Sequence, residues 1–175
     1  MAAVHSNPGG VGMLIRPLNA TDRAAIAEML DRCGAFNWEE IRVALEVFEE
    51  GLSAKCPDAY VLFGAEVEGG LRGYVCVGHV PLTVNSWDIY WLCVHPCAQR
   101  LGLGRALLAH GEDYVRQQGG GRMVAQTSGR ADYARAHEFY ASLGYALVGR
   151  VPDYFSEGDD GLFFCKVLPG GAAKK

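Results

Sequence analysis

The sequence predicts an α/β protein whose mixed sheet carries helices on both faces. Segments with strand-like and helix-like hydrophobic periodicity alternate along the chain, and glycine-containing turns separate them. Half of the 175 residues are apolar, which is enough to form a sizeable core. The predicted order is one strand, two helices, three strands, a helix, a strand, a helix and two closing strands, and a mixed sheet between helices is the natural way to pack it.

Each element follows from its local pattern. Runs rich in β-branched and aromatic residues predict strands at Met13–Leu18, Tyr60–Val67, Leu71–Gly78, Trp87–Val94, Arg122–Thr127, Tyr145–Val151 and Leu162–Leu168. Apolar residues at helical spacing, with caps and glycine stops, predict helices from Asn19 or Thr21 to Gly34, from Asn37 to Gly51, and over about Leu103–Gln118 and Asp132–Leu143. The segment Asn37–Glu40 has the pattern of a capping box, and Glu68–Gly70 has that of a hairpin turn.

Length and composition restrict the class of protein. We expect one domain over residues 12–168, with flexible termini at 1–11 and 169–175. The net charge of −4 argues against nonspecific nucleic-acid binding, and no apolar run approaches the roughly 18 residues of a membrane span. The six cysteines are scattered, without a C-x-x-C pair, which favours buried thiols and a reducing cytoplasm. The spacing of Cys93, His95 and Cys97 does not suit zinc, so no metal is expected.

The most informative segment joins the predicted strand ending at Val94 to the predicted helix starting at Leu103. The loop between them is basic, and Gly102 and Gly104 allow its backbone to turn sharply and approach a ligand closely. Amide groups at a helix N-terminus lack acceptors and lie at the positive end of the helix dipole. Arg100 and Arg105 add positive charge. The segment therefore predicts a binding site for a pyrophosphate.

The spacing of the loop residues narrows the kind of pyrophosphate. The dinucleotide fingerprint G-x-G-x-x-G fails because its third glycine position is Leu107. A P-loop fails because no Gly-Lys-Ser/Thr is present. The pattern that remains is Gln/Arg-x-x-Gly-x-Gly, which is met by Gln99, Gly102 and Gly104.

With this motif the chain resembles the GNAT superfamily of acetyl-coenzyme A (acetyl-CoA)-dependent N-acetyltransferases, of the bacterial type that acts on small acceptors or proteins. A second segment, His137–Tyr145, is similar to the F-Y-x-x-x-G-Y/F signature of that family. The two motifs stand in the family's order, about 40 residues apart, and the element order matches over residues 12–168. The resemblance implies a central, mostly antiparallel mixed sheet and acetyl-CoA as cosubstrate.

The resemblance also implies which residues hold the cosubstrate. In the family the pantetheine arm pairs with the strand that precedes the loop, which here implies the backbones of Leu92, Cys93 and Val94. The Val94 amide would face the thioester oxygen. The diphosphate would contact the loop residues Gln99, Arg100, Leu101, Gly102, Leu103, Gly104 and Arg105.

Two catalytic residues follow from the same comparison. Tyr140 matches the family's tyrosine that approaches the cofactor sulfur and serves the leaving thiolate as a general acid or hydrogen-bond donor. Asp88 stands six residues before Val94, at the spacing of the catalytic glutamate in histone-acetylating relatives, and is a candidate general base acting through water. Ribosomal-protein-type relatives instead have a glutamate where this chain has Gln126, which cannot accept a proton at neutral pH. A water chain without a single base remains an alternative.

The predicted function is transfer of an acetyl group to a primary amine by direct attack in a ternary complex. The alternative is a noncatalytic acyl-CoA-binding module or sensor on the same fold, which the glutamine at position 126 keeps open. An acidic loop with Asp153, Glu157, Asp159 and Asp160 could attract a cationic amine or simply be solvated. The partners expected are acetyl-CoA and a small-molecule or protein amine that the sequence does not identify. A homodimer stays open because dimers are common among relatives.

Overall fold

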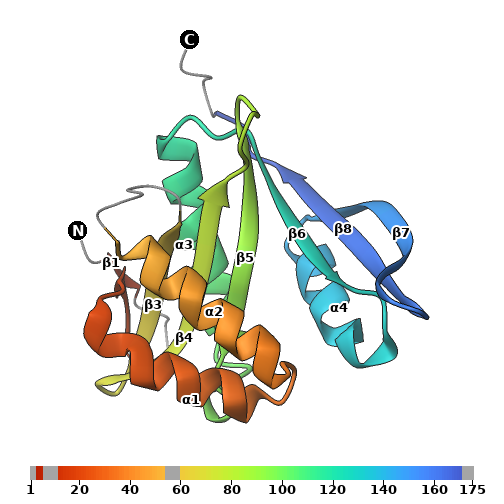
Figure 1. Ribbon diagram of the computed structural model, residues 1–175. Coiled ribbons are helices and arrows are strands. Elements are labelled where there is room, and N and C mark those ends of the chain that lie inside the picture. Colours follow the sequence, from red (N-terminus) through yellow and green to blue (C-terminus); the bar gives the residue numbers. More distant parts are fainter. Residues whose placement is uncertain (1–2, 6–11, 54–59, 171–175) are drawn as a thin grey trace. The chain divides into compact units, whose positions relative to one another are not determined.

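The computed structural model describes residues 3–5, 12–53 and 60–170. Apart from an additional short strand over Ala3–His5, the strands and helices follow the predicted order, and the described strand pairs include antiparallel pairs and a parallel pair, which confirms the mixed α/β class (Figure 1). The chain divides into two compact units, formed by residues 1–79 with 91–113 and by residues 80–90 with 114–175. None of the helices in the described segments is long and apolar enough to cross a membrane. The expectation of one domain over 12–168 stays a prediction.

The first unit contains an antiparallel run of strands in the order β1 (Ala3–His5), β2 (Met13–Pro17), β3 (Val61–Val67) and β4 (Gly70–His79). β1 lies in the terminal segment 1–11, and it pairs with β2 through Ala3 opposite Ile15. The other residues of that segment, and residues 171–175, lie outside the described part of the chain. Between β3 and β4, positive φ angles at Glu68 (53°) and Gly69 (76°) form the tight hairpin turn that the sequence predicts.

Two helices cover one face of this sheet (Figure 1). A short 3₁₀ turn, Ala20–Asp22, leads into α1 (Arg23–Cys33), and Asn19 caps it as expected. α2 (Trp38–Gly51) begins at the predicted capping box, in which the Asn37 side chain accepts from two backbone amides and Glu40 accepts from the Asn37 amide at 2.7 Å. The caps supply partners for amides that the helices themselves leave unpaired.

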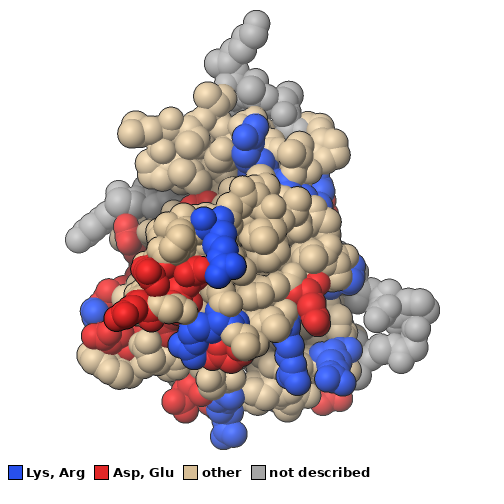
Figure 2. Space-filling view, turned by 90° about the vertical axis from the view of Figure 1, so that its right-hand side faces the viewer, with Lys and Arg blue, Asp and Glu red and all other residues tan. Residues whose placement is uncertain are grey.

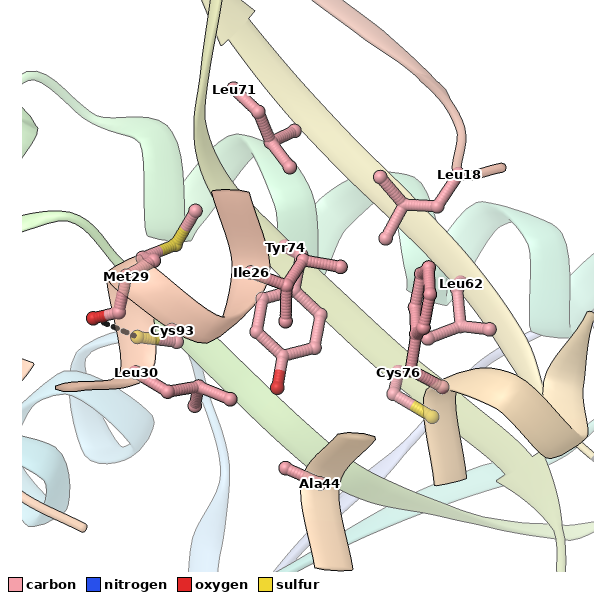
Figure 3. Close-up of a cluster of buried hydrophobic side chains, with 11 residues drawn as sticks. Leu18, Ile26, Met29, Leu30, Ala44, Leu62, Leu71, Tyr74, Cys76 and Cys93 are labelled. Carbon is pink, nitrogen blue, oxygen red and sulfur yellow. Dashed lines mark hydrogen bonds between the residues drawn. The ribbon is translucent and has the colours of Figure 1, made fainter. Parts of the chain in front are cut away.

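The core of the first unit forms where α1 and α2 pack against the sheet. Figure 3 shows Tyr74 at the centre of this cluster, with its ring among aliphatic side chains from both helices and from β3. The buried members are Leu18, Ile26, Met29, Leu30, Ala44, Phe48, Leu62, Leu71, Tyr74, Cys76 and Cys93. The Tyr74 hydroxyl is buried and has no hydrogen-bond partner among the described residues. Desolvation raises the pKa of Tyr74 well above its ordinary value, so the phenol stays neutral.

β5 (Ser86–Val94) and α3 (Leu103–Gln117) each contribute residues to both units, and a 3₁₀ turn, Pro96–Ala98, lies between them. In the second unit the strand order is β5, β6 (Arg122–Ser128), β8 (Asp159–Val167) and β7 (Ala146–Ser156). β5 and β6 are parallel, and the other pairs are antiparallel. α4 (Ala134–Ser142) follows a 3₁₀ turn over Ala131–Tyr133 and lies on this part of the sheet (Figure 1).

The last two strands are longer than the sequence predicts. The segment expected as an acidic loop continues β7 to Ser156 and starts β8 at Asp159, with Gly158 (φ 81°) in the turn. Its carboxylates have partners: Asp160 pairs with Arg150, and Asp159 is buried. The interpretation as a free acidic rim is therefore wrong for these two residues. In Figure 2 acidic and basic side chains are interspersed, and the described residues drawn there form no continuous basic surface.

Replacing Tyr74 with phenylalanine is expected to stabilise the protein. The change removes a hydroxyl that is desolvated without a hydrogen bond, and such a group costs about 1 kcal/mol or more of folding free energy. The measurement is the free energy of unfolding in urea. Tyr145→Phe is the matched control because the Tyr145 hydroxyl contacts the Met123 sulfur at 3.8 Å, so its removal brings no gain. A loss of stability in Tyr74→Phe at least as large as in the control would contradict this account of the core.

Candidate active site

The first unit contains the loop that follows β5. The His95 amide donates to the Arg72 carbonyl on β4 at 2.8 Å, which fixes the exit of the chain from the sheet. After the 3₁₀ turn, Arg100 (φ 64°) and Gly102 (φ 83°) both have left-handed backbone conformations. A Cβ at Gly102 would meet no atom within 4 Å, so the conformation, and not a lack of space, favours glycine there.

The loop and the first turn of α3 leave a row of backbone amides without acceptors. The six N–H groups of residues 100–105, here called the amide cradle, donate to no protein group in the described part of the chain. The first helical bond runs from the Ala106 amide to the Gly102 carbonyl at 3.0 Å. Left-handed residues alternating with ordinary ones make a concave set of donors, and the helix dipole adds positive potential. The amide cradle can therefore bind an anion through the main chain.

Buried side chains hold the amide cradle in place. Leu103, Leu107 and Leu108 are almost completely buried and fix the first turns of α3 against the sheet. On β4, a Cβ at Gly73 would lie 2.9 Å from Leu107 and 3.2 Å from the Cys93 carbonyl oxygen, so only glycine allows this close approach. The cradle is therefore set by hydrophobic packing beneath it.

Two arginine side chains next to the amide cradle have positive charges that no ion pair among the described residues neutralises. Arg100 and Arg105 are exposed, and neither forms an ion pair with any residue in the described segments. The Gln99 side-chain amide donates to the Val94 carbonyl at 3.4 Å, linking the loop to the end of β5. Two free guanidinium groups beside unpaired amides suit a multiply charged anion such as a diphosphate.

Along most of β5 the burial alternates from one residue to the next. Trp87, Ile89 and Cys93 are buried, whereas the residues with even numbers, Asp88 and Val94 included, are more exposed. The parallel ladder with β6 runs from Ser86 opposite Arg122 to Ile89 opposite Ala125 and does not include the next pair, Tyr90 and Gln126. The ladder thus ends one residue beyond Asp88.

Asp88 lies in the second unit on the more exposed face of β5. Its carboxylate is about half buried and has no hydrogen-bond or ion-pair partner among the described residues. Burial disfavours the charged form and raises the pKa of Asp88 above the ordinary aspartate value. A carboxylate that is partly desolvated and unpaired is a stronger base than a free one.

Tyr140 is placed by the helix stop that its motif encodes. Gly144 (φ 85°) ends α4 in a left-handed conformation, and the Gly144 and Tyr145 amides donate to the Ala141 and Tyr140 carbonyls in the pattern of a Schellman motif. This turn brings the Tyr145 ring to 5.6 Å from the Tyr140 ring. Tyr140 also stacks on Phe164 of β8 at 5.8 Å. The turn at Gly144 therefore reverses the chain, and the aromatic rings of Tyr145 and Phe164 pack against Tyr140.

The environment of Tyr140 keeps its phenol group protonated. The residue is 9 % exposed, and desolvation raises its pKa above the ordinary tyrosine value. Its hydroxyl makes no hydrogen bond to the described residues. At neutral pH it is therefore a neutral phenol with an unused donor.

Two polar residues of the second unit were not singled out by the sequence. His137 on α4 places Nε2 2.8 Å from the Ser128 carbonyl oxygen. Ser128 uses its hydroxyl to donate to Asp159 at 2.5 Å. Both contacts join residues of different elements, nine and 31 positions apart, so no local pattern marks them.

The family model of the acetyltransferase (GNAT) family matches residues 23–145. The chain belongs to this family. The matched residues include the amide cradle, Asp88 and Tyr140. The search of curated proteins found no match.

Solved structures agree with membership of the GNAT family. A Desulfovibrio desulfuricans protein assigned to the GNAT family is 31% identical, with a TM-score of 0.85 over 89% of this chain and 99% of that one. The Salmonella typhimurium protein yncA, assigned as an acetyltransferase and solved with its cofactor acetyl-CoA, is 25% identical, with a TM-score of 0.72 over 93% of this chain and 98% of its own. The Escherichia coli ribosomal-protein-S18-alanine N-acetyltransferase has the same fold, at 24% identity and a TM-score of 0.72 over 89% of this chain and 94% of its own.

The structure places the predicted residues of this GNAT chain in two groups. Leu92, Cys93, Val94 and the loop residues 99–105 belong to the first unit, and Asp88 and Tyr140 belong to the second. The Cys93 side chain points into the core, with its thiol 3.9 Å from the Met29 carbonyl oxygen (Figure 3). Only its backbone is then available to a ligand.

Proposed function

We propose that this chain transfers the acetyl group of acetyl-CoA to a primary amine by direct attack in a ternary complex. The observation that carries the proposal is the amide cradle, with two unpaired arginines beside it, in a chain of the GNAT family. A row of main-chain donors at a helix N-terminus suits the diphosphate of a coenzyme A thioester. Residues 99–105 would hold that diphosphate.

The end of β5, directly before the loop, would bind the pantetheine arm. The backbone groups of Leu92, Cys93 and Val94 would pair with the amides of the pantetheine arm as an additional strand does. The Val94 amide would donate to the thioester oxygen. One such donor can lower the barrier by about 3 kcal/mol when it faces the charge that develops in the transition state.

Two side chains of the second unit would move the protons. Asp88 would accept, through water, the proton that the ammonium must lose before its nitrogen can attack the thioester carbon. A carbon–nitrogen bond then forms, the nitrogen loses a second proton to water, and the carbon–sulfur bond breaks with its electron pair leaving on sulfur. Tyr140 would donate a proton or a hydrogen bond to that thiolate. The products are an N-acetylated amine and the free thiol.

Tyr140→Phe is expected to reduce turnover about 100-fold, the usual contribution of a positioned acid. The assay follows release of the coenzyme A thiol with a panel of primary amines that includes polyamines, aminoglycosides, amino acids and peptides. Tyr74→Phe is the matched control, because it also removes one phenol hydroxyl but in the core of the first unit. Tight acetyl-CoA binding without thiol release from any amine would overturn the proposal and favour the noncatalytic sensor.

Asp88→Asn is expected to change the pH profile as well as the rate. Because burial raises the pKa of Asp88, wild-type kcat/KM falls on acidification at a pH above the ordinary aspartate range. The variant loses the limb set by Asp88, its kcat/KM follows the fraction of free amine instead, and it is about 100-fold slower at neutral pH. Its deficit shrinks as the pH approaches the pKa of the amine, where less deprotonation is needed.

The measurement for Asp88→Asn is kcat/KM from pH 5 to 10, with Asp31→Asn, an exposed carboxylate on α1, as the control. Parallel profiles for Asp88→Asn and wild type would assign proton removal to a water chain instead. A homodimer and a cytoplasmic location stay predictions.

A further inference from the structure

α4 carries Tyr140, and among the described residues one histidine makes the side-chain hydrogen bond between this helix and the sheet. Neither α4 nor the 3₁₀ turn before it has a side-chain cap. Ser142, near the end of α4, bonds only to the Phe139 carbonyl within the helix. Among the described residues, the contact of His137 with Ser128 is the one side-chain hydrogen bond that joins α4 to a strand.

The bond partner of His137 is itself firmly held. Ser128 ends β6, where it stands opposite Gly161 of β8, and its hydroxyl donates to the buried Asp159 at 2.5 Å. The next amide, of Gly129, donates to the Asp160 carbonyl at 2.7 Å. The Ser128 carbonyl therefore offers a fixed acceptor, and a carbonyl requires that His137 carry its proton on Nε2.

A shared aromatic platform connects His137 with Tyr140. The two residues are three positions apart on α4, so they lie on neighbouring positions of one helix face. The His137 ring lies 5.8 Å from the Phe164 ring at an interplanar angle of 22°. The Tyr140 ring lies 5.8 Å from the same Phe164 ring at 28°. Phe164 thus contacts both side chains.

We propose that His137 is a positioning residue for Tyr140. Its hydrogen bond to the Ser128 carbonyl sets the rotation of α4 on β6 and β8, and with it the seat of Tyr140 on Phe164. Stacked aromatic rings can shift over one another at little cost, so stacking alone does not fix the position of α4. A 2.8 Å hydrogen bond to a fixed carbonyl does restrict that position. This inference rests on the proposed role of Tyr140 in serving the leaving thiolate.

The first test is a double-mutant cycle with kcat and the acetyl-CoA KM as readouts. His137→Ala is expected to lower kcat about tenfold, because small misplacements of a reacting group cost this much or more, and to leave the KM unchanged. His137→Gln keeps a side-chain N–H donor and restores kcat to within about threefold of wild type. In a Tyr140→Phe background, His137→Ala changes kcat less than about twofold, because the group it positions is gone.

The outcomes separate this inference from the proposed function. If Tyr140→Phe alone has wild-type kcat, the role of Tyr140 fails and the positioning role fails with it. If Tyr140→Phe is slow but His137→Ala has an equal effect in both backgrounds, only the positioning role is overturned. Glu138→Ala, at an exposed neighbour on α4, is the control and retains wild-type kcat.

The second test needs no acceptor amine. In protein labelled with carbon-13 at the tyrosine ring carbon next to the hydroxyl, the NMR signal that disappears in Tyr140→Phe reports on Tyr140. We expect His137→Ala to shift or broaden this signal and His137→Gln to restore it, with melting temperatures measured for each variant. A signal unchanged in a folded His137→Ala protein would overturn the inference.

Discussion

Everything proposed for this protein depends on six backbone amides that the fold leaves without acceptors. Helix α3 starts immediately after a loop in which Arg100 and Gly102 take left-handed conformations, and the amides of residues 100–105 donate to no group in the described part of the chain. Donors left in this state favour a ligand that supplies several acceptors and negative charge. Side-chain identity matters less here than backbone conformation, which explains why glycine spacing is the strongest signal in the sequence.

Hydrophobic packing next to these amides holds the loop and the first turn of α3 in one position. Leu103, Leu107 and Leu108 bury the first turns of α3, and Gly73 lets β4 approach close to α3 and β5. A similar logic applies in the second unit, where Gly144 ends α4 and aromatic rings hold Tyr140. In both units the residues proposed for chemistry are held by apolar contacts, and the cradle amides, the Asp88 carboxylate and the Tyr140 hydroxyl have no partner among the described residues.

The sequence predicted most of the fold because most of its elements are marked locally. The capping box at Asn37 and the turn at Glu68–Gly69 each lie within a few residues, and the structure confirms both. The extent of β7 and β8 was not predicted because it depends on pairing between strands. The acidic residues there look like a solvated loop until Asp159 is seen to be buried against Ser128.

The same limit applies to the candidate site. The loop after β5 and the motif that contains Tyr140 are each a continuous stretch of sequence. Their glycines and their order along the chain are therefore enough to predict both parts of the site. The bond between His137 and Ser128 spans nine residues and a change of element, and it depends on the angle at which α4 meets the sheet. Histidine on a helix is common on protein surfaces, so the residue type alone does not indicate this contact.

The most direct measurement is a crystal structure of the protein with bound acetyl-CoA. The account predicts that the diphosphate accepts hydrogen bonds from the amides of residues 100–105, with N–O distances of about 2.7–3.2 Å. Arg100 or Arg105 would lie beside it, and the thioester would extend along Leu92–Val94. A structure in which acetyl-CoA occupies another surface while these amides contact only solvent would contradict the central claim.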